Sequence, residues 1–399
     1  MTAAPSPASP STARAINDRL ALNLLQEEGP LTASQLKTRT GLSRPSVADL
    51  VERLGTAGLI EIVGESGAQR RGPNARLYGI VARRHFLAAV DVRTDSATAV
   101  VTDLLGHPLA EAALPVAAPR DALAVLRQTA RAAGADALHT VMVGAPGLVA
   151  PATGELRDTT GLPSWHRELV GLLRRELPAR VLVENETNLA AVAEQRLGAA
   201  RDLDSFVLLW LGAGVGAAVV LDGRLRRGAS GGAGEIGFLP VPGTGGLPSA
   251  TECAGGFHAL AGAAAVAELA ATHGVPGPAL TALTAATATT AAPAASGAPA
   301  GPGRAGAEAF LEAYAERLAL GAAAVAAVLD PGCVILGGEL GRAGGPALAD
   351  RVARRLAGLT PVPTAVRATA LGDPAVLAGA RLAARDAAQE VVFGFAGPG

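Results

Sequence analysis

The sequence contains few of the residues that build disulfide or metal-bound frameworks. Of its 399 residues only Cys253 and Cys333 are cysteines, and they do not form a Cys-X-X-Cys pair. Neither a disulfide framework nor a cysteine-rich metal site can be assembled from them within one chain. A reducing cytoplasm is therefore the expected location.

The chain also lacks membrane and export signals. Residues 1–11 are rich in Pro, Ala and Ser, without a basic segment followed by an apolar one. No charge-free apolar run is long enough for a membrane-spanning helix. We therefore expect no membrane partner, and we expect residues 1–11 to be a disordered tail.

The chain has little net charge and almost no lysine. A formal net charge of -1 would argue against a nucleic-acid partner if it were averaged over the molecule. Arg70, Arg71 and Arg76 lie close together, however, and the average hides this basic segment. The use of Arg in place of Lys, beside abundant Ala and Gly, is typical of a GC-rich genome and indicates no function.

Residues 12–82 have the spacing of a winged helix-turn-helix DNA-binding domain. Residues 12–28 place apolar side chains at helical intervals, and a Gly-Pro pair ends that helix. A capping box from Thr32 to Gln35 begins a short second helix, which ends at Gly41.

A third helix follows, with Ser43 as its cap and Pro45 in its first turn. Four apolar residues then recur at i, i+3, i+4 and i+7 and should face inward. The polar residues of the opposite face suit the major groove and the phosphates beside it. The expected DNA-binding residues of this helix are Ser43, Arg44, Ser46, Asp49 and Arg53.

Residues 59–63 and 76–80 predict the two strands of a wing. The loop between them carries Arg70 and Arg71, which can reach phosphate or a narrow minor groove. DNA binding should therefore weaken steeply with salt. The alternative is an ordinary helix bundle with solvated arginines, but helix lengths, turn and wing together favour a DNA-binding domain.

Residues 83–399 alternate apolar strands with helical stretches, which predicts an α/β domain with two similar lobes. We expect the first lobe over about 83–200 and the second over about 201–375. An Ala-, Pro- and Gly-rich insert at about 274–305 is predicted to be disordered. An amphipathic helix at about 375–391 should dock on the domain.

Four glycine-rich or acidic stretches follow the predicted strands, namely Gly144-Ala145-Pro146-Gly147, Glu184-Asn185-Glu186-Thr187-Asn188, Gly212–Gly216 and Gly234-Glu235-Ile236-Gly237-Phe238. With the winged helix-turn-helix they resemble the ROK family (repressor, open reading frame, kinase) over nearly the whole chain. The resemblance implies a two-lobed, actin-like (ribonuclease H-like) domain of the sugar-kinase type.

In kinases of this family, the resemblance implies, an Asn-Asp pair and two Glu side chains hold the sugar hydroxyls. Carboxylates and a carboxamide can bind paired hydroxyls bidentately. The matching ligand-binding candidates are Gly147, Asn185, Glu186, Glu235 and Glu252. Asn185 has the alternative role of a helix cap, and Glu235 that of a solvated turn residue.

Two departures from the family argue against phosphoryl transfer. Glu186 occupies the position of the kinase base, where its extra methylene displaces the carboxylate by about 1.5 Å, and a base must approach its proton closely. The loop that reads Asp-Gly-Gly-Thr in a kinase contains Arg93 and Asp95 instead, which obstruct or repel a phosphate. We therefore assign no catalytic residue and no cofactor.

A third departure concerns the family's structural zinc. Phe238 stands where the zinc-binding His is expected, and the loop after Val241 lacks the three cysteines. His258 and Cys253 are too few to replace them, so no metal site is predicted.

The sequence as a whole predicts a transcriptional regulator. The resemblance implies a repressor more often than an activator. It should bind a double-stranded DNA operator as a homodimer or tetramer, because one recognition helix reads too few base pairs for specificity. Its ROK domain should be catalytically inactive and is a candidate sensor of a sugar or sugar derivative. An ATP-dependent sugar kinase with a DNA-binding domain, and a ligand-independent DNA-binding dimer, remain open alternatives.

Overall fold

The computed structural model describes residues 10–66, 75–157, 163–249, 255–292, 302–372 and 374–394. The expected tail, the wing arginines Arg70 and Arg71 and the candidate ligand residue Glu252 lie outside these ranges. Within them, no helix is long and apolar enough to cross a membrane.

The N-terminal domain is a winged helix-turn-helix. In chain order it comprises α1 (Pro10–Glu28), β1 (Leu31–Thr32), α2 (Ala33–Thr40), α3 (Arg44–Thr56), β2 (Ile60–Ser66) and β3 (Ala75–Ile80). The Thr32–Gln35 capping box is present, and Gly41 ends α2 in the left-handed conformation. Ser43 caps α3 with Pro45 in the first turn, and β2 pairs with β3 as the wing. The predicted helices and wing are confirmed.

The first lobe is a five-stranded sheet in the order β6-β5-β4-β7-β8. Its elements are η1 (Ala82–Arg84), β4 (Phe86–Val92), β5 (Ala97–Thr102), β6 (Pro108–Leu114), α4 (Pro119–Ala132), β7 (Leu138–Ala145), α5 (Trp165–Glu176) and β8 (Arg180–Asn185). Helices α4 and α5 pack on one face, over a core that includes Leu126 and Leu173.

The second lobe repeats this plan in the order β11-β10-β9-β12-β13. Its elements are β9 (Phe206–Leu211), β10 (Val215–Leu221), β11 (Arg224–Arg226), η2 (Ile236–Phe238), α7 (His258–Ala261), α8 (Ala263–Thr272), α9 (Ala279–Ala291), α10 (Pro302–Leu329), β12 (Cys333–Gly337), α11 (Gly338–Ala357) and β13 (Ala365–Ala368). Each lobe combines antiparallel strands with two parallel pairings, which confirms the duplicated two-lobed fold.

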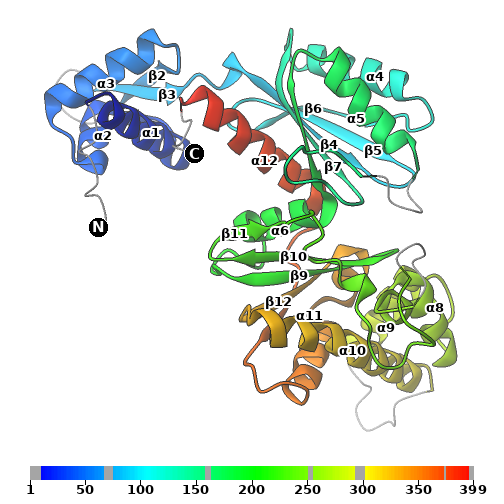
Figure 1. Ribbon diagram of the computed structural model, residues 1–399. Coiled ribbons are helices and arrows are strands. Elements are labelled where there is room, and N and C mark those ends of the chain that lie inside the picture. Colours follow the sequence, from blue (N-terminus) through cyan, green and yellow to red (C-terminus); the bar gives the residue numbers. More distant parts are fainter. Residues whose placement is uncertain are drawn as a thin grey trace, which may run out of the picture.

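Two helices connect the parts of the molecule. Helix α6 (Glu186–Leu197) leads from the first lobe to the second, and α12 (Ala375–Val392) returns to pack on α6, β4 and β7. Figure 1 shows α12, in red, lying under the first lobe and ending near the winged helix-turn-helix. The predicted C-terminal helix therefore docks, and it does so on the first lobe.

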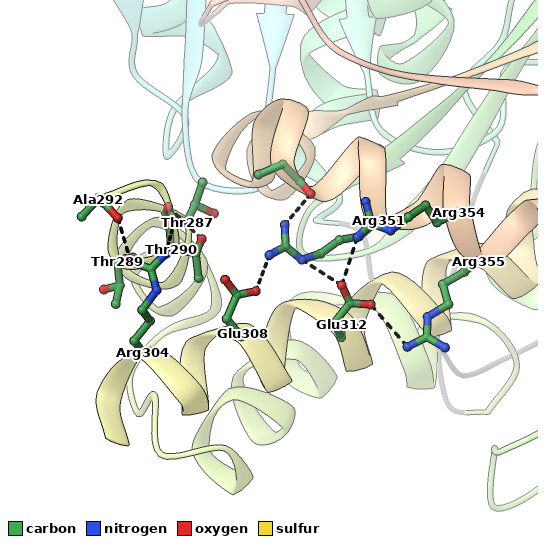
Figure 2. Close-up of polar contacts among 11 residues, drawn as sticks. Thr287, Thr289, Thr290, Ala292, Arg304, Glu308, Glu312, Arg351, Arg354 and Arg355 are labelled. Atoms are coloured by element: carbon green, nitrogen blue, oxygen red, sulfur yellow. Dashed lines mark hydrogen bonds and ion pairs between the residues drawn. The ribbon is translucent and has the colours of Figure 1, made fainter. Parts of the chain in front are cut away.

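The expected disorder of the insert at 274–305 is wrong for residues 302–305, which begin α10, and for residues 279–291, which form α9. Its small apolar residues fill the space between neighbouring helices, and Leu283 is fully buried. Arg304 of α10 donates hydrogen bonds to the carbonyl oxygens of Thr290 (2.9 Å) and Ala292 (2.7 Å), at the end of α9 (Figure 2). Tertiary packing and this capping arginine supply the stabilisation that the local sequence does not indicate.

An ion-pair network joins α10 to α11 beside this contact. Figure 2 shows Arg351 between Glu308 and Glu312, with Arg354 and Arg355 also directed at Glu312. The Arg351 side chain is largely buried. The network therefore fixes the two long helices of the second lobe against each other.

Candidate functional site

Asn185 lies at the junction of β8 and α6 and caps the helix. Its Oδ1 accepts hydrogen bonds from the backbone N–H groups of Thr187 (2.8 Å) and Asn188 (3.3 Å). Its Nδ2 donates to the carbonyl oxygen of Gly147 at 3.0 Å. The structure thus has Asn185 in its alternative role as a cap, and it brings Asn185 and Gly147 together as neighbours.

Glu184 is a site residue that sequence reasoning did not single out, although it belongs to the same acidic stretch. Its buried Oε1 accepts a hydrogen bond from Nδ2 of Asn188 at 2.9 Å. Its Oε2 accepts from Nε of Arg227 at 2.6 Å. Because Arg227 follows β11 in the second lobe, this ion pair links the two lobes.

Arg93 makes a second link between the lobes. It extends from the end of β4, donating from Nε to Oδ2 of Asp91 (3.2 Å) and from Nη1 to Oε1 of Glu339 (3.0 Å). Glu339 belongs to the first turn of α11, in the second lobe. His166 donates from Nε2 to the Arg93 carbonyl oxygen at 3.0 Å, which fixes the loop.

Glu186 lies in the first turn of α6, within the electrostatic field of this cluster. Burial, followed by the charges of Asp91 and Glu339, raises the pKa of Glu186 to about 7, and Arg93 opposes the rise. Glu186 is therefore protonated in a large fraction of molecules at neutral pH. We call Asp91, Arg93, Glu184, Asn185, Glu186, Arg227 and Glu339 the interlobe site.

The loop that carries Glu235 packs against the first lobe. Gly231 has a φ of +87°, and a Cβ at this position would lie 2.1 Å from the carbonyl oxygen of Val149, so only glycine fits. The neighbouring Gly232 faces both Leu148 and Glu235. Glu235 is exposed, as its alternative role of a solvated turn residue requires, although partial desolvation of its carboxyl raises its pKa. Glu235 thus lies near the segment after Gly147, while Glu252 is outside the described residues.

A small pocket of about 20 Å³ lies beside the Arg93–Glu339 ion pair. Its lining includes Arg93, Trp210, Glu339, Arg342 and Thr369. Among the described lining residues there are none of the sugar-binding candidates, so this cavity is separate from Asn185 and Glu235.

Phe238 packs edge-on against His258, with ring centroids 5.5 Å apart. Nδ1 of His258 accepts a hydrogen bond from the Val215 backbone N–H at 3.1 Å, and burial lowers the pKa of His258. The imidazole thus serves packing. In the part of the chain that the structure describes, no group of three or more His, Cys, Asp or Glu side chains could hold a metal ion.

The recognition helix differs from expectation at Arg53. Instead of lying free on the outer face, Arg53 binds Asp18 of α1 with Nη2–Oδ1 at 2.5 Å and Asp49 with Nη1–Oδ2 at 2.5 Å. The hydrogen bond to Asp18 is the main cause of the raised pKa of Arg53. Ser43 and Ser46 hydrogen bond to each other, while Arg44, Ser46 and Asp49 are exposed.

Comparison with known proteins places these features in a family. Residues 87–387 match the model of the ROK family, and residues 16–72 match that of the MarR family. The chain belongs to the ROK family. Since the ROK match covers both lobes, the interlobe site is that of a ROK domain.

The chain is similar both to kinases and to regulators of the ROK family. It is 34% identical to the glucokinase of Halalkalibacterium halodurans over 133 residues, 33% of this chain and 40% of that protein. It is 26% identical to the DNA-binding transcriptional dual regulator NagC of Escherichia coli K12 over 238 residues, 57% of each. The chain thus spans about half the length of these relatives.

A solved structure covers almost the whole fold. The crystal structure of a ROK family transcriptional regulator, a homolog of the E. coli MLC protein, has a TM-score of 0.70 and 21% identity, over 96% of this chain and 98% of that one. This likeness confirms that a winged-helix domain and a two-lobed ROK domain share one chain.

Proposed function

We propose that this ROK family member is a DNA-binding transcriptional regulator, acting as a repressor, whose ROK domain senses a sugar-like effector without phosphorylating it. The observation that supports this most is the winged helix-turn-helix joined to a ROK domain in which Arg93 and Glu339 form an ion pair. Relatives named as regulators, such as NagC, agree with it.

The DNA contacts that we propose use the exposed start of α3 and the wing. Arg44 and Ser46 are exposed and lie at the N-terminal end of the recognition helix, which is the end that reads base edges in helix-turn-helix proteins. Arg70 and Arg71 fall between the two wing strands in the sequence and would bind phosphates. Arg53 stabilises the domain through Asp18 and contributes less to DNA.

Two features of the interlobe site argue against phosphoryl transfer. The Arg93 guanidinium occupies the loop that approaches the phosphates in a kinase, and its ion pair with Glu339 bridges the lobes there. Arg93 also lacks the conformational freedom of glycine, so backbone N–H groups cannot approach a phosphate as closely. Phosphate binding would require this ion pair to break.

One observation favours the alternative function of an ATP-dependent sugar kinase. A general base works best when its pKa is close to the operating pH, and the pKa of Glu186 is raised to about 7. Its longer side chain and the Arg93–Glu339 ion pair argue against catalysis. The regulator therefore remains the stronger proposal.

Incubation of the purified protein with ATP, magnesium and a panel of hexoses tests this choice. We expect no ADP release above that of a Glu186→Ala control. ADP release that depends on a hexose and on Glu186 would establish the kinase and refute the non-enzymatic proposal.

We propose that an effector binds at the interlobe site and changes the closure of the lobes. Glu184–Arg227 and Arg93–Glu339 join opposite lobes, so a ligand that reorganises either pair would favour one closure angle. In a dimer, closure would change the spacing of the two recognition helices, and DNA affinity would shift reciprocally with effector affinity. The effector class that we favour is a sugar or sugar derivative.

A thermal-shift screen of sugars tests the sensor. A ligand at a hundred times its dissociation constant stabilises the folded protein by about 2.7 kcal/mol, which is measurable. Asn185→Ala and Glu235→Ala variants should lose the response. If no sugar stabilises the protein at millimolar concentration, the ligand-independent DNA-binding dimer becomes the better description.

A further inference from the structure

A second candidate site lies where the DNA-binding domain joins the first lobe. An open groove of about 660 Å³ is lined by Arg83, Arg84, His85, Asp136, His139 and Pro178, among other residues. We call it the linker groove. It lies where the parallel strands β4, β7 and β8 begin, whereas the interlobe site lies where they end. The two sites are thus at opposite ends of one sheet.

The linker groove is rich in cationic and imidazole groups. The rings of His85 and His139 meet edge to face with centroids 4.7 Å apart. Burial lowers the pKa of both; the charges of His139 and Arg84 add to the effect on His85, and that of Arg180 adds to it on His139. The described lining of the groove thus holds Arg83, Arg84 and two imidazoles beside a single carboxylate, that of Asp136.

One wall of the groove also holds the end of the recognition helix. Nη1 of Arg84 donates a hydrogen bond to the carbonyl oxygen of Ala57, the residue that follows α3. The Val81 N–H donates to the Leu59 carbonyl oxygen at 3.0 Å, which fixes the same segment to the linker. A ligand that engages Arg84 would therefore act directly on the position of α3.

We propose that the linker groove binds a small soluble molecule that bears a phosphate group. Guanidinium groups match the oxygens of a phosphate bidentately, and imidazolium adds further charge-assisted hydrogen bonds. A compact ligand is favoured over duplex DNA because His85 and His139 are half-buried, and a small group reaches them more readily. Binding of the phosphate would raise the pKa of both imidazoles.

Titration of the full-length protein with inorganic phosphate and with sulfate, in the absence of DNA, tests the site. Binding is followed by calorimetry and by the imidazole NMR signals. We expect saturable binding. Arg83→Ala and His139→Asn should each lose about tenfold or more in affinity, because each substitution removes a hydrogen bond to a charged group. Arg120→Ala, in α4 outside the groove, is the matched control and should bind as the original protein does.

The pH dependence gives a second readout. Sulfate stays a dianion between pH 7.5 and pH 6, while His85 and His139 become protonated as the pH falls. The other charged groups that face these rings are Arg83 and Arg84 from the linker, Asp136 from the loop before β7 and Arg180 from β8. Sulfate should therefore bind more tightly at pH 6, and His139→Asn should reduce that gain.

Three results would overturn the proposal. Equal affinity of the original protein and Arg83→Ala for both anions would show that the groove is not the site. Imidazole signals that respond to duplex DNA but not to phosphate or sulfate would make it a DNA contact. Sulfate affinity that is unchanged between pH 7.5 and pH 6 would exclude the two imidazoles. The phosphate and sulfate titrations contain no DNA. Their results are therefore independent of the proposed regulatory function.

Discussion

Replacing Arg93 by Ala removes a guanidinium that forms ion pairs with both Asp91 and Glu339. Asp91 is 5% exposed, and Arg93 and Glu339 are each 33% exposed. The substitution therefore leaves the carboxyl groups of Asp91, Glu186 and Glu339 without the positive charge of Arg93. Both the stability of the protein and its pH dependence should change.

The magnitude follows from the burial and the pKa. A pair exposed by a third is partly screened, so loss of the Arg93 contacts should cost ~1 kcal/mol at pH 5.5. The folded-state pKa of Glu186 is raised from 4.5 to about 7, so its stabilising contribution is present below pH 4.5 and lost as the pH rises through 7. Without Arg93 the pKa of Glu186 rises further. At a pH above this pKa, each additional pKa unit lowers the free energy of unfolding by ~1.4 kcal/mol.

Urea unfolding at pH 5.5 and pH 8 measures the effect. Trp165 lies in the first lobe and Trp210 in the second, so fluorescence reports on both. We expect Arg93→Ala to be about 1 kcal/mol less stable at pH 5.5 and about 2–3 kcal/mol less stable at pH 8. Arg120→Ala is the control. In the Glu186→Gln background, Arg93→Ala should destabilise the protein equally at pH 5.5 and pH 8. A deficit that is equal at both pH values, or larger at pH 5.5, would refute this reasoning.

Three further predictions concern other parts of the chain. Arg304→Ala should speed hydrogen exchange in α9 and cost ~1 kcal/mol, because carbonyl groups at the helix end lose their donor; exchange unchanged in α9 would contradict this. Arg53→Ala and Asp18→Asn should destabilise the DNA-binding domain by about 1 kcal/mol each, with a non-additive double variant; additive melting losses would argue against the pair. Arg70→Ala with Arg71→Ala should weaken binding to every duplex and lower the slope of log K against log salt concentration by about 1.8 in magnitude. An unchanged slope would show that the wing does not contact DNA.

Local signals predicted the N-terminal domain well. The capping box at Thr32, the cap at Ser43 and the positive φ of Gly41 depend on neighbouring residues, so the sequence contains all that determines them. The side chain of Arg53 could not be predicted in this way. Its partner Asp18 is 35 residues away, and only the packing of α1 against α3 brings them together.

The same limit applies to the interlobe site. The motifs located Asn185, Glu186 and Gly147 at strand ends, and in the structure Asn185 hydrogen bonds to Gly147. Periodicity cannot indicate the Arg93–Glu339 pair, because its members are 246 residues apart and belong to different lobes. Helix α9 was missed for a related reason. Its Ala- and Thr-rich sequence has no amphipathic pattern, and it is stabilised by burial between other helices.

The central proposal is that this ROK protein binds specific DNA and that a sugar changes the affinity. Selection of bound sequences from a random duplex library, followed by titration of the selected duplex with and without the sugars that stabilise the protein, tests it most directly. We predict enrichment of a near-palindromic sequence, loss of specificity in Arg44→Ala, and a shift in affinity with sugar. Failure to enrich any sequence would contradict the proposal.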